Sequence, residues 1–125
     1  MTELAPGQKH DQGKTPYHLV QWPIVEGIAT VLAFGAAKYA PNSWQRVTAA
    51  RERYFAACVR HVLAWWGGER IDRESGLPHL HHAACNLMFL DHFDRADAKL
   101  VAPPVPFTPP DTPRMVRNFW PEDNP

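Results

Sequence analysis

The chain has 125 residues, 45% of them hydrophobic and 21% charged, which is the composition of one ordinary globular domain with a modest core. Thirteen Lys and Arg residues balance thirteen Asp and Glu residues, so no overall basic field is available for a long nucleic acid or an anionic membrane. No apolar run approaches the roughly 18 residues that span a bilayer, and the N-terminus lacks an apolar signal segment, so we expect a cytoplasmic protein.

The first helix follows a polar N-terminal segment. Residues 1–21 contain two prolines and two glycines, and we expect them to form an extended arm. Pro23 suits a first helical turn, where its missing N–H is not needed, and IVEGIATVLAFGAAKY continues with helical spacing. Pro41 and Asn42 then break the pattern. The predicted apolar face comprises Ile24, Ile28, Val31, Leu32 and Ala36.

Two further helices are predicted downstream. RERYFAACVRHVLAWW forms the second, and Gly67 and Gly68 stop it. The third starts at Pro78 and continues to about Leu100. The predicted apolar face of the second helix comprises Phe55, Cys58, Val59, Val62 and Trp66. That of the third comprises Leu80, Ala83, Ala84, Leu87, Leu90 and Asp91. Both cysteines fall in apolar patterns, so we expect buried, reduced thiols.

The sequence therefore predicts an all-α fold of about three main helices over residues 22–100. Residues 101–125 form a proline-rich C-terminal arm that still carries apolar side chains, and we expect it to pack on its own domain or on a neighbouring subunit. Three helices of this length bury little surface by themselves, so we expect a homo-oligomer to complete the fold.

An acidic and histidine-rich stretch, GGERIDRESGLPHLHH, joins the second and third helices. A connection of about ten residues lets them return antiparallel, which puts His61 and His82 at similar heights on facing helices. His79, His82 and Asn86 share one stripe of the third helix. Converging carboxylates and imidazoles can hold a divalent ion that offsets phosphate charge and activates water. The candidate metal ligands are Asp72, Glu74, Glu69, His61, His79 and His82.

The same residues also have purely structural interpretations. Glu74 and Ser75 can cap the third helix, because acidic groups favour a helix N-terminus, and the whole loop can be a hydrated connection. By helical phase, His81 and His92 point away from the predicted site, and we expect them on the surface. The two tryptophans that end the second helix are expected in the core.

Residues suited to binding a nucleotide flank this loop. Lys38 can pair with phosphate, although it can equally complement the helix C-terminal dipole, and the nearby aromatic rings can stack on a base or cover the core. Arg60 offers a bidentate phosphate donor or an ordinary ion pair. The sequence has neither a P-loop nor a GxGxxG loop, and no GxSxG nucleophile motif. The candidate substrate-binding residues are Lys14, Lys38, Tyr39, Asn42, Trp44, Arg60 and Asn86.

These segments resemble a known family. DQGK, FGAAKYAPNSW and RYFAACVRHVLAWWGGERIDRESGLPHLHHAACNLMFL are similar to the N-terminal domain of the largely phage-encoded dATP/dGTP diphosphohydrolases, over about residues 11–93. The run from Arg60 to Asn86 is the most specific part. The resemblance implies a small helical protein that cleaves a purine deoxynucleoside triphosphate to the monophosphate and pyrophosphate, in the host cytoplasm if the gene belongs to a phage.

The spacing and the resemblance together predict metal-dependent hydrolysis of a purine nucleoside triphosphate, with Mg²⁺ or Mn²⁺ at the predicted ligands. The candidate catalytic residues are Glu74, Asp72 and His82. One of these carboxylates, or His82, takes a proton from the attacking water. The ion and the basic side chains at positions 14, 38 and 60 stabilise the phosphate charge.

Two alternatives remain at the level of the sequence. Better-known all-α nucleotide pyrophosphatases carry ExxE and ExxD carboxylate pairs on helices. This chain does not reproduce such pairs on its predicted helices, which favours a non-catalytic protein that sequesters a nucleotide or a host defence signal. A structural helical module with a solvated polar loop is the second alternative.

Overall fold

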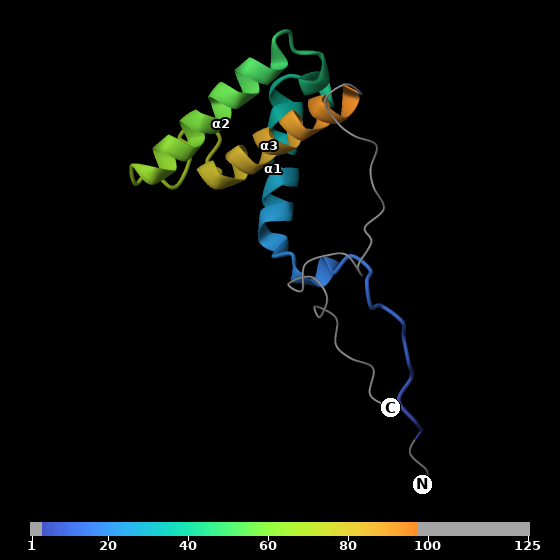
Figure 1. Cartoon of the computed structure of the whole chain (residues 1–125). Helices are drawn as coiled ribbons and strands as arrows, with labels where there is room; N and C mark the ends of the chain where they lie inside the picture. Colours follow the sequence, from blue (N-terminus) through green and yellow to red (C-terminus); the bar gives the residue numbers. More distant parts are fainter. Residues whose placement is uncertain (1–3, 98–125) are drawn as a thin grey trace. The chain divides into compact units, whose positions relative to one another are not determined.

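The computed structural model of the protein describes residues 4–97 (Figure 1). Residues 4–20 and 21–97 belong to separate compact units, and each is described by itself. The first contains one short 3-10 helix, η1 (Tyr17–Leu19). The second contains α1 (Trp22–Lys38), η2 (Ser43–Arg46), α2 (Ala50–Trp66) and α3 (His79–Ala96). With no strand between residues 4 and 97, the predicted all-α class with three main helices is confirmed.

Helix α1 crosses α3 where a glycine allows close approach. Pro23 lies in the first turn of α1, as predicted, and the helix ends at Lys38. A Cβ atom added to Gly27 would lie 2.1 Å from Nδ1 of His81 on α3, so only glycine leaves room for this imidazole. The segment after α1 turns through Asn42, which has a left-handed φ of 60°.

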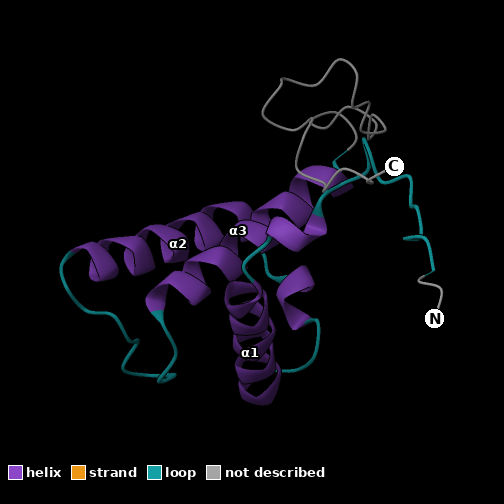
Figure 2. Cartoon of the chain, turned by 90° about the horizontal axis from the view of Figure 1, so that it is seen from below, coloured by secondary structure: helices purple, strands orange, loops and turns teal. Residues whose placement is uncertain are grey.

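Helices α2 and α3 form an antiparallel pair (Figure 2). At one end, Arg51 Nη2 donates a hydrogen bond to the Phe93 carbonyl at 3.0 Å, and Arg51 Nε lies 3.3 Å from Asp94 Oδ1. Midway along the pair, Cys58 Sγ lies 3.7 Å from the Ala83 carbonyl oxygen. These contacts set the first turn of α2 level with the last turn of α3.

The hydrophobic core of the described residues is small. Both cysteines are free and buried, as the sequence predicts. The buried polar side chains are those of His79 and Asn86. The buried apolar residues are Val31, Ala50, Cys58, Ala83 and Cys85. The fully buried side chains are therefore mostly small or polar.

The predicted apolar faces of α2 and α3 are wrong in part. Helical phase fixes which residues share a face, but it does not decide which face packs within the chain. Cys58 and Ala83 are buried as expected, whereas Trp66, expected in the core, is 79% exposed. The other residues of the predicted faces that lie exposed are Ile24 on α1, Phe55, Val59 and Val62 on α2, and Leu80, Leu87 and Asp91 on α3.

The expected surface position of His81 and His92 is wrong. Both are half-buried, because His81 packs on Gly27 and His92 lies edge-on to Trp44 with ring centroids 4.8 Å apart. Helix α3 ends at Ala96, short of Leu100, and the C-terminal arm lies outside the described residues. Within residues 4–97, no helix is long and apolar enough to cross a membrane.

Candidate metal and nucleotide site

The loop between α2 and α3 folds back on itself through backbone hydrogen bonds. Ile71 and Pro78 form an antiparallel bridge, and the Asp72 amide donates to the Leu77 carbonyl at 2.8 Å. Asp72 Oδ1 accepts hydrogen bonds from the backbone amides of Ser75, at 2.8 Å, and of Glu74, at 3.0 Å. The Asp72 side chain thus stabilises the turn that positions its own carboxylate.

This geometry excludes the alternative in which the side chains of Glu74 and Ser75 cap α3. The helix begins at His79 after Pro78, and no side chain caps it. The Glu74 carboxylate instead forms an ion pair with Lys38 at the end of α1. Because proline already enforces an extended conformation before the helix, the loop leaves these two side chains free for other contacts.

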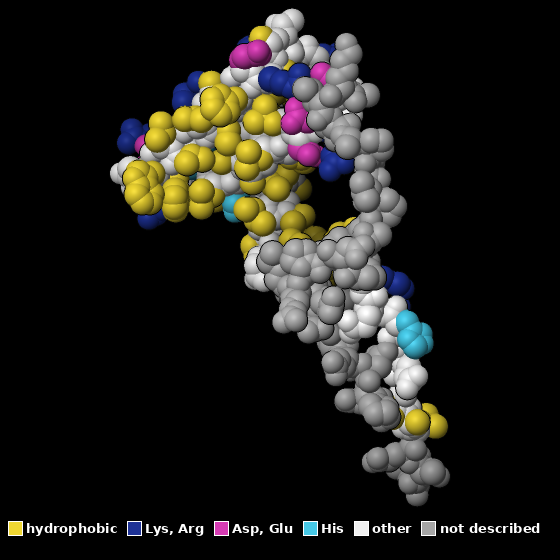
Figure 3. All heavy atoms as spheres, in the orientation of Figure 1, with side chains coloured by type: hydrophobic (Ala, Val, Ile, Leu, Met, Phe, Trp, Pro, Cys, Tyr) yellow, Lys and Arg dark blue, Asp and Glu magenta, His cyan; other side chains and the backbone are white. Residues whose placement is uncertain are grey.

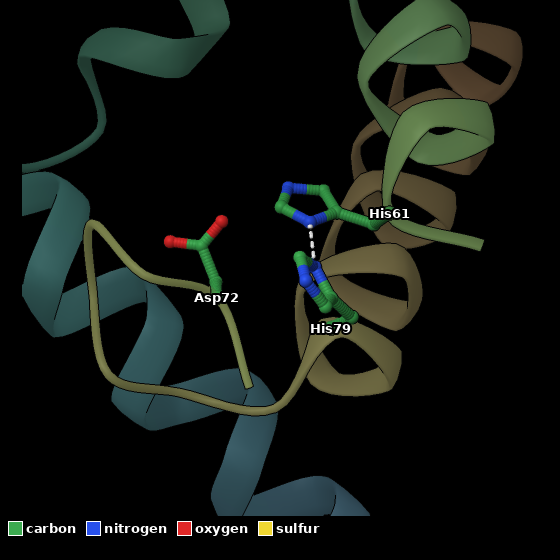
Figure 4. A group of neighbouring side chains, drawn as sticks. All are labelled: His61, Asp72 and His79. Atoms are coloured by element: carbon green, nitrogen blue, oxygen red, sulfur yellow. Dashed lines mark hydrogen bonds between the residues drawn. The ribbon is translucent and has the colours of Figure 1, made fainter. Parts of the chain in front are cut away.

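Three side chains, from α2, the loop and α3, lie close together (Figure 4). His61, Asp72 and His79 each offer one ligand atom, and these atoms lie within 4.8 Å of one another. His61 Nδ1 and His79 Nδ1 are 2.8 Å apart. Two imidazole nitrogens and one carboxylate oxygen form a donor set that fits a divalent cation, and the nitrogens favour Mn²⁺ over Mg²⁺.

Glu69 orients one of these imidazoles from behind. Its Oε1 lies 3.1 Å from His79 Nε2, and the His79 side chain is only 5% exposed. A carboxylate accepts at this contact, so His79 Nε2 carries the proton and its Nδ1 presents a lone pair toward His61. A carboxylate behind a histidine is a common arrangement around protein-bound metal ions. Glu69 therefore contacts the group through His79 and is not one of its three members.

A third histidine, His82, extends the cluster. The ring of His82 stacks on that of His61 with centroids 4.5 Å apart, and His82 Nε2 lies 2.6 Å from Ser75 Oγ. Burial lowers the pKa of both His61 and His82, although the negative charge of Asp72 acts in the opposite direction on each. Although burial alone would raise the pKa of Asp72, the hydrogen bonds from Ser75 and Glu74 bring it below its ordinary value. At neutral pH the neutral imidazoles of His61 and His82 thus lie beside the ionised carboxylate of Asp72.

A cleft of about 1130 Å³ opens from this cluster between α1, η2, α2 and α3. His61, Asp72 and His82 line one part of it. An aromatic group lines another part, where Trp44 stacks on Phe89 with centroids 4.3 Å apart and the Tyr54 hydroxyl donates to the Trp44 carbonyl at 2.9 Å. Pockets for small ligands and cofactors usually have about 300–1,000 Å³. The cleft can therefore accommodate a nucleotide.

Comparison with known proteins identifies the family. The model of the family described as "dATP/dGTP diphosphohydrolase, N-terminal" matches residues 4–101 of the chain. The chain belongs to this family. A curated relative, the dATP/dGTP diphosphohydrolase of Salmonella phage PMBT28, is 43% identical over 84 residues. That alignment covers 67% of this chain but 28% of the relative, so the chain spans little more than a quarter of the longer protein. No solved structure matches the chain.

In this diphosphohydrolase-family domain, most of the predicted site residues line one cleft. Lys14 belongs to the separate N-terminal unit. Glu69 and His79 do not line the cleft; His79 contacts His61, which does, and Glu69 contacts His79. The predicted residues that line the cleft are Lys38, Tyr39, Asn42, Trp44, Arg60, His61, Asp72, Glu74, His82 and Asn86.

Sequence reasoning missed three contributors to the site. Tyr54 and Phe89 line the cleft, and Ser75 contacts His82. The spacing of Phe89 offered a signal, because it lies seven positions after His82 and so shares its stripe on α3. The contact of Ser75 with His82 depends on the fold of the loop, which periodicity does not describe.

Proposed function

We propose that this domain hydrolyses a purine deoxynucleoside triphosphate, dATP or dGTP, to the monophosphate and pyrophosphate with the help of Mn²⁺ or Mg²⁺. The observation that carries the proposal is the convergence of His61, Asp72 and His79 beside a cleft that also contains aromatic rings and basic side chains. The family description and the name of the phage relative support the choice of a purine substrate.

His61, Asp72 and His79 would hold the ion. A divalent ion bound there supplies positive charge that offsets the charge of the substrate phosphates. Lys38 and Arg60 line the cleft and would add positive charge from α1 and α2. The ion pair with Lys38 leaves Glu74 the role of positioning this lysine, in place of direct ligation. The triphosphate would thus lie between the histidine cluster and the end of α1.

The purine base would lie toward the aromatic side of the cleft. Tyr39 lines the cleft and is 71% exposed, so its ring is accessible for stacking. Trp44 already stacks on Phe89 and serves as a wall. Asn86, which is 7% exposed, lines the cleft one helical turn beyond His82 and offers an amide donor and acceptor to the substrate. Asn42 would border the same region.

We assign the proton acceptor to His82. Its neutral imidazole lines the cleft, and Ser75 Oγ can donate to it or accept from it as its protonation changes. A water oxygen would form a bond to the α-phosphorus while the bond from that phosphorus to the bridging oxygen breaks. Pyrophosphate leaves with the bond electrons, and the water proton passes to His82.

The direct test is product analysis after incubating the full chain with dATP or dGTP and Mn²⁺ or Mg²⁺. We expect deoxynucleoside monophosphate and pyrophosphate. Asp72→Asn keeps the oxygen that accepts the loop hydrogen bonds but removes the charge, and it should lower the rate at least about a hundredfold. Asp91→Asn, an exposed position on α3, is the matched control and should leave the rate unchanged. If the wild-type chain formed no more product than Asp72→Asn, the proposed hydrolysis would be excluded.

A second candidate is nucleotide binding without cleavage. Glu69 and Glu74 are engaged by His79 and Lys38, which leaves Asp72 as the carboxylate in the three-residue metal group. The chain also spans only 28% of its phage relative. Calorimetry with dGTP, followed by analysis of the recovered ligand, separates the two functions: stoichiometric binding with intact triphosphate favours sequestration.

A further inference from the structure

The outer surface of the α2–α3 pair carries a continuous band of exposed apolar side chains. On α2, Phe55, Val59, Val62 and Trp66 repeat with spacings of four, three and four residues. This is the spacing of a helix seam that packs against other helices. Leu80 and Leu87 continue the band on α3. We call this band the outer seam; its residues are Phe55, Val59, Val62, Leu63, Trp66, Leu80 and Leu87.

The outer seam lies on the face opposite the nucleotide cleft. At 100° per residue, the seam positions of α2 and α3 are turned away from the positions that line the cleft, such as Arg60 and His82. Figure 3 shows hydrophobic side chains gathered over the near face of α2 and α3, and in the same orientation α1 lies behind them. Covering the seam would leave the cleft open.

The exposed seam is large enough to need a partner. Phe55 and Leu63 are each 62% exposed and Trp66 is 79% exposed. Taking the usual size of aliphatic and aromatic side chains, the seven residues expose on the order of 700 Å², close to the roughly 800 Å² that each partner contributes to a standard interface. Isolated exposed apolar residues are common on monomers, but a contiguous band of this size marks an interaction surface.

We propose that the outer seam binds a second copy of this chain, so that two α2–α3 pairs form a four-helix bundle with both clefts on the outside. A two-fold axis parallel to the helices places α2 of one copy on α3 of the other, antiparallel, and joins the two apolar bands. The small core within one chain is then supplemented by a larger core between two chains.

Charges at the ends of the seam favour this axis. Glu52 lies three positions before Phe55, at the border between the seam and the cleft. Arg95 lies four positions after Asp91, with which it forms an ion pair at 2.7 Å, and both Glu52 and Arg95 are exposed. The contact of Arg51 with Asp94 sets these ends of α2 and α3 level. The axis therefore brings Glu52 of one copy close to Arg95 of the other, twice. Pairing α2 with α2 would instead place the Glu52 carboxylate against the Trp66 ring, where it would lack a cation.

Analytical ultracentrifugation of the full chain tests the proposal. We expect a species of twice the 14.2 kDa chain mass that dissociates on dilution. Val59→Glu and Leu87→Glu each place a charge in the seam and should weaken the dimer at least a hundredfold. Val25→Glu, at an exposed valine of α1 outside the seam, is the matched control and should remain dimeric. Wild-type protein that stays monomeric at millimolar concentration, or seam variants as dimeric as the control, would overturn the proposal.

A charge exchange tests the axis and guards against variants that only misfold. Glu52→Arg and Arg95→Glu should each weaken the dimer, because each brings like charges together. The double variant restores opposite charges and should recover most of the wild-type dimer affinity. If the losses of dimer affinity in the two single variants simply added in the double variant, α2 of one copy would not lie on α3 of the other.

Discussion

His61 Nδ1 lies 2.8 Å from His79 Nδ1, and the opposite nitrogen of the His79 ring lies 3.1 Å from Glu69 Oε1. Two such nitrogens approach this closely when one donates a proton to the other, or when both lone pairs face one cation. Because the Glu69 carboxylate fixes the His79 proton on Nε2, the Nδ1 atom of His79 offers its lone pair in either case, to the proton of His61 or to the cation. The Glu69 carboxylate thus determines which atom the buried His79 offers.

Replacing the Glu69 carboxylate should weaken metal binding, although Glu69 is not itself a member of the metal-ligand group. Glu69→Gln keeps the shape of the side chain but can offer an amide N–H to His79 Nε2, which would favour the other tautomer. We expect Mn²⁺ affinity, measured by calorimetry, to fall by roughly 10–100-fold. Glu26→Gln, at an exposed position of α1, should bind like the wild type. Equal affinities in all three proteins would mean that Glu69 does not orient His79.

The crossing of α1 and α3 should tolerate no side chain at Gly27. An added Cβ would lie 2.1 Å from Nδ1 and 2.4 Å from Cγ of His81, so the ring itself must move. Gly27→Ala should lower the free energy of unfolding by about 1–3 kcal/mol, measured by urea denaturation.

Gly35 provides the control for this substitution within the same helix. Nothing lies within 4 Å of a Cβ added there, so Gly35→Ala should be neutral or should stabilise α1 by up to about 1 kcal/mol. Combining Gly27→Ala with His81→Ala should recover part of the loss. Equal effects of the two glycine substitutions would contradict the close approach of the helices.

Stability should fall in mild acid because of two cleft histidines. Burial lowers the pKa of His61 and of His82 below the ordinary 6.5, so the unfolded chain binds more protons than the folded one as the pH falls through this value. The free energy of unfolding should therefore be highest above about pH 7 and should decrease on acidification. The lowered pKa of Asp72 acts in the same direction, but only near and below its ordinary 3.8.

Urea denaturation in a chelating buffer, at about pH 8 and about pH 5.5, measures this dependence. The double variant His61→Asn/His82→Asn has no cleft imidazole to protonate, and its stability should change less between the two conditions. If the free energy of unfolding fell as much in the double variant as in the wild type between these pH values, other groups would be responsible for the acid sensitivity.

The sequence predicted which residues share a helix face more reliably than it predicted where that face points. The apolar spacing from Phe55 to Trp66 is regular, yet this face is exposed, while α2 packs inward through the small residues Ala50 and Cys58. Burial depends on the partner that a face meets, and a single chain's periodicity does not contain that partner. The stripe holding His79, His82 and Asn86 was predictable because its residues lie three and four apart on one helix.

The loop of the site was less predictable, for a related reason. Spacing alone suggested six candidate metal ligands, whereas the fold distinguishes Asp72 in the cluster, Glu69 behind His79, and Glu74 beside Lys38. These three carboxylates have similar sequence surroundings. Their different contacts arise from the backbone hydrogen bonds that fold the loop, such as that from the Asp72 amide to Leu77, and these have no residue-level signature.

The thiol of Cys85 should be unreactive toward thiol reagents in the folded protein. The residue is 1% exposed, and burial raises the pKa of the Cys85 thiol to about 11, so little thiolate forms at pH 8 and a reagent has no direct access to it. Burial also raises the pKa of Cys58, which is 8% exposed. Ellman's reagent at about pH 8 should therefore label both thiols at least about a hundredfold more slowly in the native protein than in urea.

Labelling of the two thiols should accelerate with urea in parallel with unfolding, and the thiols of Gly27→Ala should react faster than those of the wild type. Rapid reaction of one thiol in the native wild-type protein would show that the α2–α3 contact opens without global unfolding.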